Sequence, residues 1–172
     1  MKIRIASLAV MALLAGLMAS HPAAAQVTCP QANSTTAAPV VHNQHIFCGE
    51  VSSGKGKGFH SRPGGLNPAS VANTGTPAAI VGAPAGIYNL RNFNITQGGV
   101  TRTKAISTMY PDACAQADVL AAIRNAVATG VRGANGQFTG SSGTHCQAGG
   151  APFNIIGYLD GAGEVITAWP NY

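Results

Sequence analysis

The stretch from His45 to Gly65 reads HIFCGEVSSGKGKGFHSRPGG, and it decides how the rest of the chain is interpreted. It contains two histidines, His45 and His60. An unperturbed imidazole titrates near ~6.5, so one ring can accept a proton while the other donates one. The glycines let the backbone approach a ligand closely. The stretch also contains three cations, which would hold an anionic substrate beside the histidines: Lys55, Lys57 and Arg62. The stretch therefore predicts an acid–base centre suited to cleaving a phosphodiester without a metal ion.

Residues 1–25 are typical of a secretory signal peptide. Lys2 and Arg4 form a charged head, an apolar run follows, and Ala23 to Ala25 provide a small-residue cleavage site. We expect the mature protein to be a single domain, residues 26–172, in a secreted or periplasmic location. No later run of about 18 apolar residues predicts a membrane span, so no membrane partner is expected.

The charge and the cysteines agree with an exported protein that binds nucleic acid, without identifying one. Removing Lys2 and Arg4 with the signal lowers the formal charge from +5 to +3, a mild basic bias. Four cysteines remain in the mature chain, and export predicts that they form two disulfide bonds. These cysteines are Cys29, Cys48, Cys114 and Cys146. Three pairings are possible and the sequence does not choose among them, but a bridge from Cys48 would brace the segment that carries His45.

A zinc site is the alternative interpretation of the first histidine. The spacing His42-x-x-His45-x-x-Cys48 would place three possible ligands on one side of a helix. A fourth ligand at a familiar spacing is missing, and an exported cysteine is more often bridged than bound to metal. The catalytic interpretation of His45 is therefore preferred.

Short strands and one helix predict an α+β fold. The lysine-bearing segment from Gly54 to Gly58 predicts the tip of a hairpin, with Phe59 to Ser61 beginning the returning strand. Two strands, 87–95 and 100–109, follow, and Arg102, Lys104 and Ile106 would share one side of the second. Asp112 is expected to cap a helix over 113–129, whose apolar stripe would cover a sheet. The glycine-rich segment 131–151 is expected to be a long loop.

The C-terminal residues 153–169 predict a hairpin that turns at Asp160 to Gly163. Side chains alternate along a strand, so Thr167 and Trp169 would lie on one face. A hydroxyl group beside an indole ring suits a nucleobase, which it would hold by one hydrogen bond and one stacking contact.

Four ordered motifs together resemble the bacterial EndoU nucleases, members of the EndoU-like ribonuclease group. They are His45-Ile46-Phe47-Cys48-Gly49-Glu50, Gly58-Phe59-His60-Ser61-Arg62-Pro63-Gly64-Gly65, Lys104 with Ser107-Thr108-Met109-Tyr110-Pro111, and Ile166-Thr167-Ala168-Trp169-Pro170. The resemblance implies antiparallel β-sheets that form a cleft, with one main helix packed outside. It also implies that His45, His60 and Lys104 are catalytic.

The same resemblance implies that Thr167 and Trp169 bind the nucleotide, often uridine, although the family often has tyrosine where this chain has Trp169. We expect Arg62, Ser107 and Thr108 to contact substrate as well. The implied reaction is transesterification of single-stranded RNA to a 2′,3′-cyclic phosphate, with DNA inert. By analogy His60 would be the base and His45 the acid. No cofactor is expected, and manganese dependence is left open because family members differ in it.

Two other functions fit the same sequence. A secreted binding protein on this fold would hold RNA, a glycan or a protein without turnover. An exported toxin would use the same chemistry on a neighbouring cell and would have a cognate inhibitor or immunity protein as its partner, which a scavenging nuclease would not need.

Overall fold

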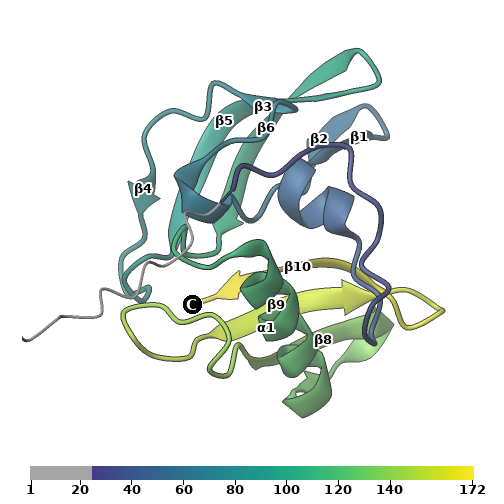
Figure 1. Ribbon diagram of the computed structural model, residues 1–172, viewed down its shortest axis with the longest axis vertical. Coiled ribbons are helices and arrows are strands. Elements are labelled where there is room, and N and C mark those ends of the chain that lie inside the picture. The colour runs from purple at the N-terminus through teal and green to yellow at the C-terminus, as the bar shows by residue number, and fades with distance from the viewer. Residues whose placement is uncertain (1–24) are drawn as a thin grey trace, which may run out of the picture.

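The computed structural model describes residues 25–172 as three antiparallel sheets, one α-helix and three short helical turns (Figure 1). The predicted signal peptide lies outside these residues, apart from Ala25. No helix within the described part of the chain has the length and apolar character needed to cross a bilayer. The strands are β1 (Glu50–Ser52), β2 (Lys55–Lys57), β3 (Val71–Ala72), β4 (Ala78–Ala79), β5 (Tyr88–Gln97), β6 (Val100–Met109), β7 (Val131–Arg132), β8 (Gln137–Ser141), β9 (Asn154–Leu159) and β10 (Val165–Asn171). The helical elements are η1 (Gln44–Cys48), η2 (Pro63–Gly65), α1 (Gln116–Thr129) and η3 (Ala134–Gly136).

The C-terminal sheet has the strand order β10-β9-β8-β7, and α1 packs beside it (Figure 1). The predicted helix and hairpin are both confirmed. The apolar stripe of α1, including Val119 and Ile123, is buried. However, α1 begins at Gln116, and Asp112 is not its cap. The carboxylate of Asp118 instead accepts a hydrogen bond of 3.1 Å from the backbone N–H of Ala115.

The prediction of a long loop over 131–151 is wrong, because this segment contains β7 and β8. In β8, Phe138 and Gly140 are buried while Thr139 between them is half-buried. A Cβ atom on Gly140 would lie 2.1 Å from the carbonyl oxygen of Ala126 in α1. The glycine therefore reflects close packing of helix against strand and not a flexible loop.

Strands β5 and β6 form the long predicted hairpin, and the short strands β3 and β4 both pair with the other edge of β5. The alternation of side chains in β5 changes phase at Asn92, whose φ of 51° lies in the left-handed region. Leu90 is buried before this point and Phe93 and Ile95 after it. Strict alternation does not hold along β6 either. The side chains of Lys104 and Ser107, three residues apart, turn to the same side and meet at 3.1 Å.

The predicted lysine-bearing hairpin is present as β1 and β2, with its turn at Ser53 and Gly54. The residues that follow, 59–61, do not form the expected strand. Phe59 has a φ of 61°, and the backbone N–H groups of Phe59 and His60 donate to the carbonyl oxygens of His45 and Ile46, each at 2.7 Å. The second histidine is therefore held by backbone contacts to η1.

Two apolar clusters stabilise the molecule, and the segment with both histidines crosses their junction. Ile46 and Phe47 of η1 belong to the larger cluster, which surrounds α1 and the C-terminal sheet. Phe59 belongs to the smaller cluster, together with residues of β5 and β6. The observed architecture is α+β, with antiparallel sheets and one main helix, as predicted.

Both predicted disulfide bonds are present, and the structure decides the pairing. Cys29 is bonded to Cys48, and Cys114 to Cys146. The first bond ties the N-terminal arm, residues 26–40, to the end of η1, three residues after His45. The second joins the segment before α1 to the loop between β8 and β9.

Candidate active site

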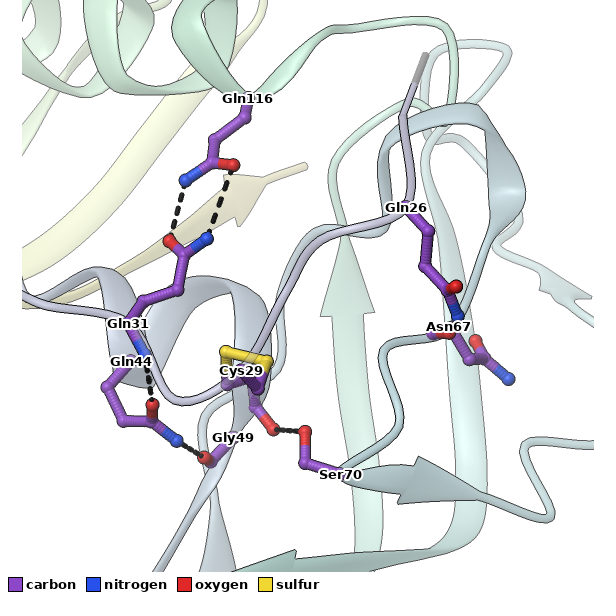
Figure 2. The surroundings of a disulfide bond; sticks show 9 residues. Gln26, Cys29, Gln31, Gln44, Gly49, Asn67, Ser70 and Gln116 are labelled. Atoms are coloured by element: carbon purple, nitrogen blue, oxygen red, sulfur yellow. Dashed lines mark hydrogen bonds between the residues drawn. A yellow bond between two sulfur atoms is a disulfide. The ribbon is translucent and has the colours of Figure 1, made fainter.

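His45 lies in η1, a turn that is fixed at its C-terminal end. Figure 2 shows the disulfide of Cys29 there, with the side chain of Gln44 bridging two backbone groups. The amide of Gln44 accepts from the N–H of Gln31 at 2.9 Å and donates to the carbonyl of Gly49 at 2.7 Å. These contacts hold the backbone on both sides of His45.

The ring of His45 is oriented by a carboxylate. Its Nδ1 lies 2.9 Å from Oε1 of Glu50, so this nitrogen carries a proton and Nε2 is left for another partner. The hydrogen bond from His45 is the main reason why the pKa of Glu50 is lowered, and the carboxylate therefore stays charged near neutral pH. This contact fixes the orientation of the His45 ring.

His60 has the opposite environment. Only 8% of its surface is exposed, and its Nδ1 lies 3.1 Å from the carbonyl oxygen of Thr108. A carbonyl oxygen can only accept, so Nδ1 carries the proton and Nε2 has a free lone pair. Burial, followed by the charges of Lys104 and His45, lowers the pKa of His60 well below its ordinary value. This imidazole is therefore neutral near pH 7.

Gly58 brings the two histidine segments together. A Cβ atom on Gly58, which has a φ of +71°, would lie 2.1 Å from the backbone oxygen of His45. A larger residue at this position would push the segments apart. With glycine there, the rings of His45 and His60 stack with centroids 5.9 Å apart and planes inclined by 24°.

The amine of Lys104 reaches the same region from β6. It donates to the carbonyl oxygen of Gly58 and, at 3.1 Å, to the hydroxyl of Ser107. That hydroxyl also lies 3.0 Å from Nδ1 of His60. Burial lowers the pKa of Lys104 to about 8, so the amine is mostly charged at pH 7. The structure thus brings together all three residues predicted to be catalytic.

Two adjoining hollows open at the histidines, where the sequence predicted one cleft. One, of about 230 Å³, is lined by His60, Ile106, Ser107, Thr108 and Trp169. The other, of about 290 Å³, is lined by His42, His45, Glu50, Lys57, Ile166 and Thr167. Thr167 therefore lies on the His45 side, and Trp169 on the His60 side.

Aromatic rings continue the row that begins with the histidines. The indole of Trp169 stacks on the ring of His60, with centroids 5.7 Å apart and planes inclined by 25°. Tyr158 of β9 follows, with its centroid 6.1 Å from that of Trp169. Trp169 also lines the hollow at His60, where an aromatic ring can stack with a base.

Arg62 is not placed to bind substrate, contrary to the prediction. Its side chain is 10% exposed, and its Nε donates to the hydroxyl of Tyr88 at 2.6 Å. It also forms an ion pair of 3.3 Å with Asp112, the residue predicted to cap the helix. Both side chains serve this buried network, and Arg62 lines neither hollow.

Ser107 and Thr108 differ in what they offer to a ligand. Ser107 is almost fully buried, and its hydroxyl donates to the carbonyl oxygen of Phe59 at 2.7 Å. It therefore serves mainly to position His60 and Lys104. Thr108 is half-buried at the edge of the hollow, where its hydroxyl lies 3.1 Å from the side-chain oxygen of Asn89.

The alternative zinc site with Cys48 is wrong, because that cysteine is in a disulfide bond and the two histidines bond to different carboxylates. One other set of possible ligands occurs among residues 25–172. His42, Asp160 and Glu164 place ligand atoms within 4.8 Å of one another. Here His42 and Glu164 already form an ion pair of 3.0 Å.

Glu50 is the site residue that sequence reasoning missed. Its position five residues after His45 suggested no contact, since the intervening chain was not predicted to fold back. The carboxylate reaches the ring because Gly49, with a φ of 67°, turns the chain sharply after η1. Lys57 lies opposite Glu50 in the β1–β2 hairpin, and it lines the same hollow.

Comparison with known proteins identifies the family of this chain. A family model described as bacterial EndoU nuclease matches residues 39–172, a range that includes every residue of both hollows. No curated protein and no solved structure matches the chain. Because the family match covers most of the sequence, the chain belongs to the bacterial EndoU nuclease family.

Proposed function

We propose that this protein is a secreted endoribonuclease that cleaves single-stranded RNA by transesterification. One observation carries the proposal. A neutral imidazole with a free Nε2 stacks 5.9 Å from a second imidazole whose Nδ1 is held by a carboxylate. This pair supplies a base and an acid near one phosphate, which is what the reaction requires.

His60 is the base in this proposal. Its free Nε2 takes the proton of a ribose 2′-hydroxyl, and the 2′-oxygen attacks the adjacent phosphorus. Because the pKa of His60 is lowered, the ring is in its proton-accepting form near neutral pH. DNA lacks the attacking hydroxyl and is not cleaved.

His45 is the acid. As the bond from phosphorus to the 5′-oxygen breaks, the ring gives its proton to that oxygen. The products are a 2′,3′-cyclic phosphate and a 5′-hydroxyl end. The carboxylate of Glu50 supports the charged imidazolium before the transfer.

Lys104 stabilises the negative charge that develops on the phosphate oxygens. Its charged amine is partly desolvated, which strengthens its attraction for an anion. The amine already donates to two oxygen atoms, of Gly58 and Ser107, so a phosphate would take the remaining proton or displace one of these contacts. No metal ion is needed for any of these steps, and we propose that activity persists in excess EDTA.

The base is held on the Trp169 side, with uridine as the preferred nucleotide. Stacking of a base on an aromatic ring contributes about 1–3 kcal/mol. We expect Trp169→Ala to raise KM for a uridine-containing substrate about tenfold, whereas Trp169→Tyr keeps most of the affinity. Equal KM values for the three proteins, measured on one fluorogenic substrate, would contradict a stacking role.

The decisive experiment uses the mature chain, a short RNA and its all-deoxy counterpart. The RNA should yield fragments ending in a 2′,3′-cyclic phosphate, identified by mass spectrometry, and the deoxy strand should remain intact. If the protein binds the RNA over a range of pH and metal conditions without cleaving it, the binding-protein alternative is correct.

Export and a toxin role are separate parts of the proposal. The two disulfide bonds support an oxidising location outside the cytoplasm. Detection of the chain without residues 1–25 in the periplasm or the medium would test export. A small protein that binds the mature chain and blocks cleavage would favour a toxin over a scavenging nuclease.

A further inference from the structure

The cations of this protein are concentrated in one part of the chain. Residues 44–109 contain six lysines and arginines and a single acidic residue, Glu50. Residues 110–172 contain two cations and four acidic residues. A polyanion is therefore attracted towards residues 44–109, the part of the chain that carries His45 and His60.

Two of these cations lie on β2, which forms one wall of the His45 hollow, and the charge of Lys57 helps to lower the pKa of Glu50 across the hairpin. Lys57 lines that hollow, and its amine makes one long contact of 3.4 Å with the hydroxyl of Ser52. Lys55, two residues earlier on β2, is exposed. Neither lysine is in a salt bridge within the described part of the chain. Arg62, by contrast, is paired with Asp112.

The pleat of β2 directs both lysines to one side. A Cβ atom on Gly56, between them, would lie 3.1 Å from the backbone oxygen of Arg102, so that side of β2 faces β6. Successive residues of a strand point to opposite sides, and Lys55 and Lys57 therefore point away from β6. Their attachment points are about 6–7 Å apart, the two-residue repeat of a strand, which is similar to the separation of neighbouring phosphates in extended RNA.

We propose that Lys57 and then Lys55 bind the phosphates on the 3′ side of the cleaved bond. The inference rests on the proposed function, and in particular on His45 as the acid. The oxygen that His45 protonates belongs to the nucleotide on the 3′ side, so this nucleotide occupies the His45 hollow. The RNA then continues in the 3′ direction past Lys57 to Lys55, while the uridine on the 5′ side of the cleaved bond stays against Trp169.

Oligonucleotides with one ribouridine in an otherwise deoxy strand test this polarity, because cleavage is then confined to one bond. Three substrates are compared: a short one, one with three extra nucleotides on the 3′ side, and one extended equally on the 5′ side. We expect the 3′ extension to raise kcat/KM more than the 5′ extension does. In Lys55→Gln most of the 3′ gain should be lost. The slope of log kcat/KM against log salt for the 3′-extended substrate should become shallower by about 1.

Arg132→Gln is the matched control, because Arg132 is an exposed cation on β7, outside both hollows. It removes the same charge from the whole protein and should leave the 3′ gain intact. Lys55 is exposed, and thermal unfolding of Lys55→Gln should match that of the wild type. Loss of the 5′ gain in Lys55→Gln, or equal loss in the two variants, would overturn the proposed polarity.

Failure of the proposed function has a different signature, which is no cleavage of any substrate by the wild type. The phosphate contacts are then measured by binding of the extended deoxyuridine strands. Trp169 is the only tryptophan of the chain, so quenching of its fluorescence reports occupancy of the site. If Lys55→Gln weakens binding of the 3′-extended strand alone, the proposed phosphate contacts are upheld. Unchanged binding would overturn them.

Discussion

The two histidine regions use the same side chain in opposite environments. His45 is on the rim of a hollow, with a carboxylate 2.9 Å from its Nδ1. His60 is buried beside an amine, with a neutral carbonyl oxygen as partner of its Nδ1. Burial and a neighbouring positive charge favour the neutral ring of His60, whereas the carboxylate at His45 fixes the orientation of its ring. In the proposed mechanism this difference makes His60 the base and His45 the acid.

Loss of either ring is the strongest test of this comparison. We expect His45→Ala and His60→Ala each to lower kcat by about 10²–10⁴-fold, since each removes one partner of the proton transfer. RNA cleavage at saturating substrate measures the effect, and circular dichroism confirms folding. Exogenous imidazole should partly restore activity to His45→Ala, whose ring lines an open hollow, more than to His60→Ala. Full activity in either variant would exclude the proposed chemistry.

The pH dependence of RNA cleavage is the second test of the two histidine regions. The reaction needs neutral His60, whose pKa is below 6.5, so activity should persist to pH values below that point. It also needs charged Lys104, whose pKa is about 8, so activity should fall as the pH rises through that value. In Lys104→Arg the part of the alkaline fall centred near 8 should disappear, even if the maximum rate is lower. A profile unchanged in shape would show that Lys104 does not titrate in this range.

Sequence reasoning predicted the regular part of the fold well. The hairpin of β5 and β6, the helix α1 and the hairpin of β9 and β10 follow apolar alternation and turn signals, which are local. Strand β8 was missed because Gly140, which permits contact with α1, is indistinguishable in sequence from a loop glycine. The N-terminal cap of α1 was misplaced because Asp112 had a stronger partner in Arg62, far away in the chain.

The site was predictable as residue types but not as contacts. His45, His60, Lys104, Thr167 and Trp169 were identified from their motifs. Four of them line the two hollows, and the amine of Lys104 lies behind the His60 hollow, on the hydroxyl of Ser107. The role of Glu50 depends on the turn at Gly49, and the burial of Arg62 depends on Tyr88. Such contacts join segments through tertiary packing, which no local pattern encodes.

Glu50→Gln tests the comparison by removing the negative charge beside His45. The amide keeps the size of the side chain but removes the charge that supports the imidazolium. A hydrogen bond to a charged group contributes about 1.5–3 kcal/mol, so we expect kcat to fall about 10–100-fold. KM should change little, and the acidic side of the pH profile, which depends on His60, should keep its position. Asp118→Asn is the control, because that carboxylate caps α1.

Removal of a disulfide bond should have the smallest effect on activity, and the two bonds should differ in that effect. Each closes a loop of similar length, with separations of 19 and 32 residues, so each should contribute about 3–4 kcal/mol to stability. Only the Cys29–Cys48 bond adjoins the turn that carries His45. Replacing this pair with serines should lower kcat several-fold at a temperature where the variant is folded. Replacing Cys114 and Cys146 should reduce the melting temperature without this loss.

The same contrast applies to reduction of the wild type, since the cytoplasm keeps thiols reduced. We expect reductant to weaken cleavage because η1 loses its tie to the N-terminal arm (Figure 2). The variant that lacks only Cys29 and Cys48 should already have this lower activity and should respond little to reductant. If reductant leaves the wild-type rate unchanged, Gln44 and the packing of Ile46 and Phe47 are sufficient to hold His45. The disulfide would then serve stability alone, and the precursor would be active before export.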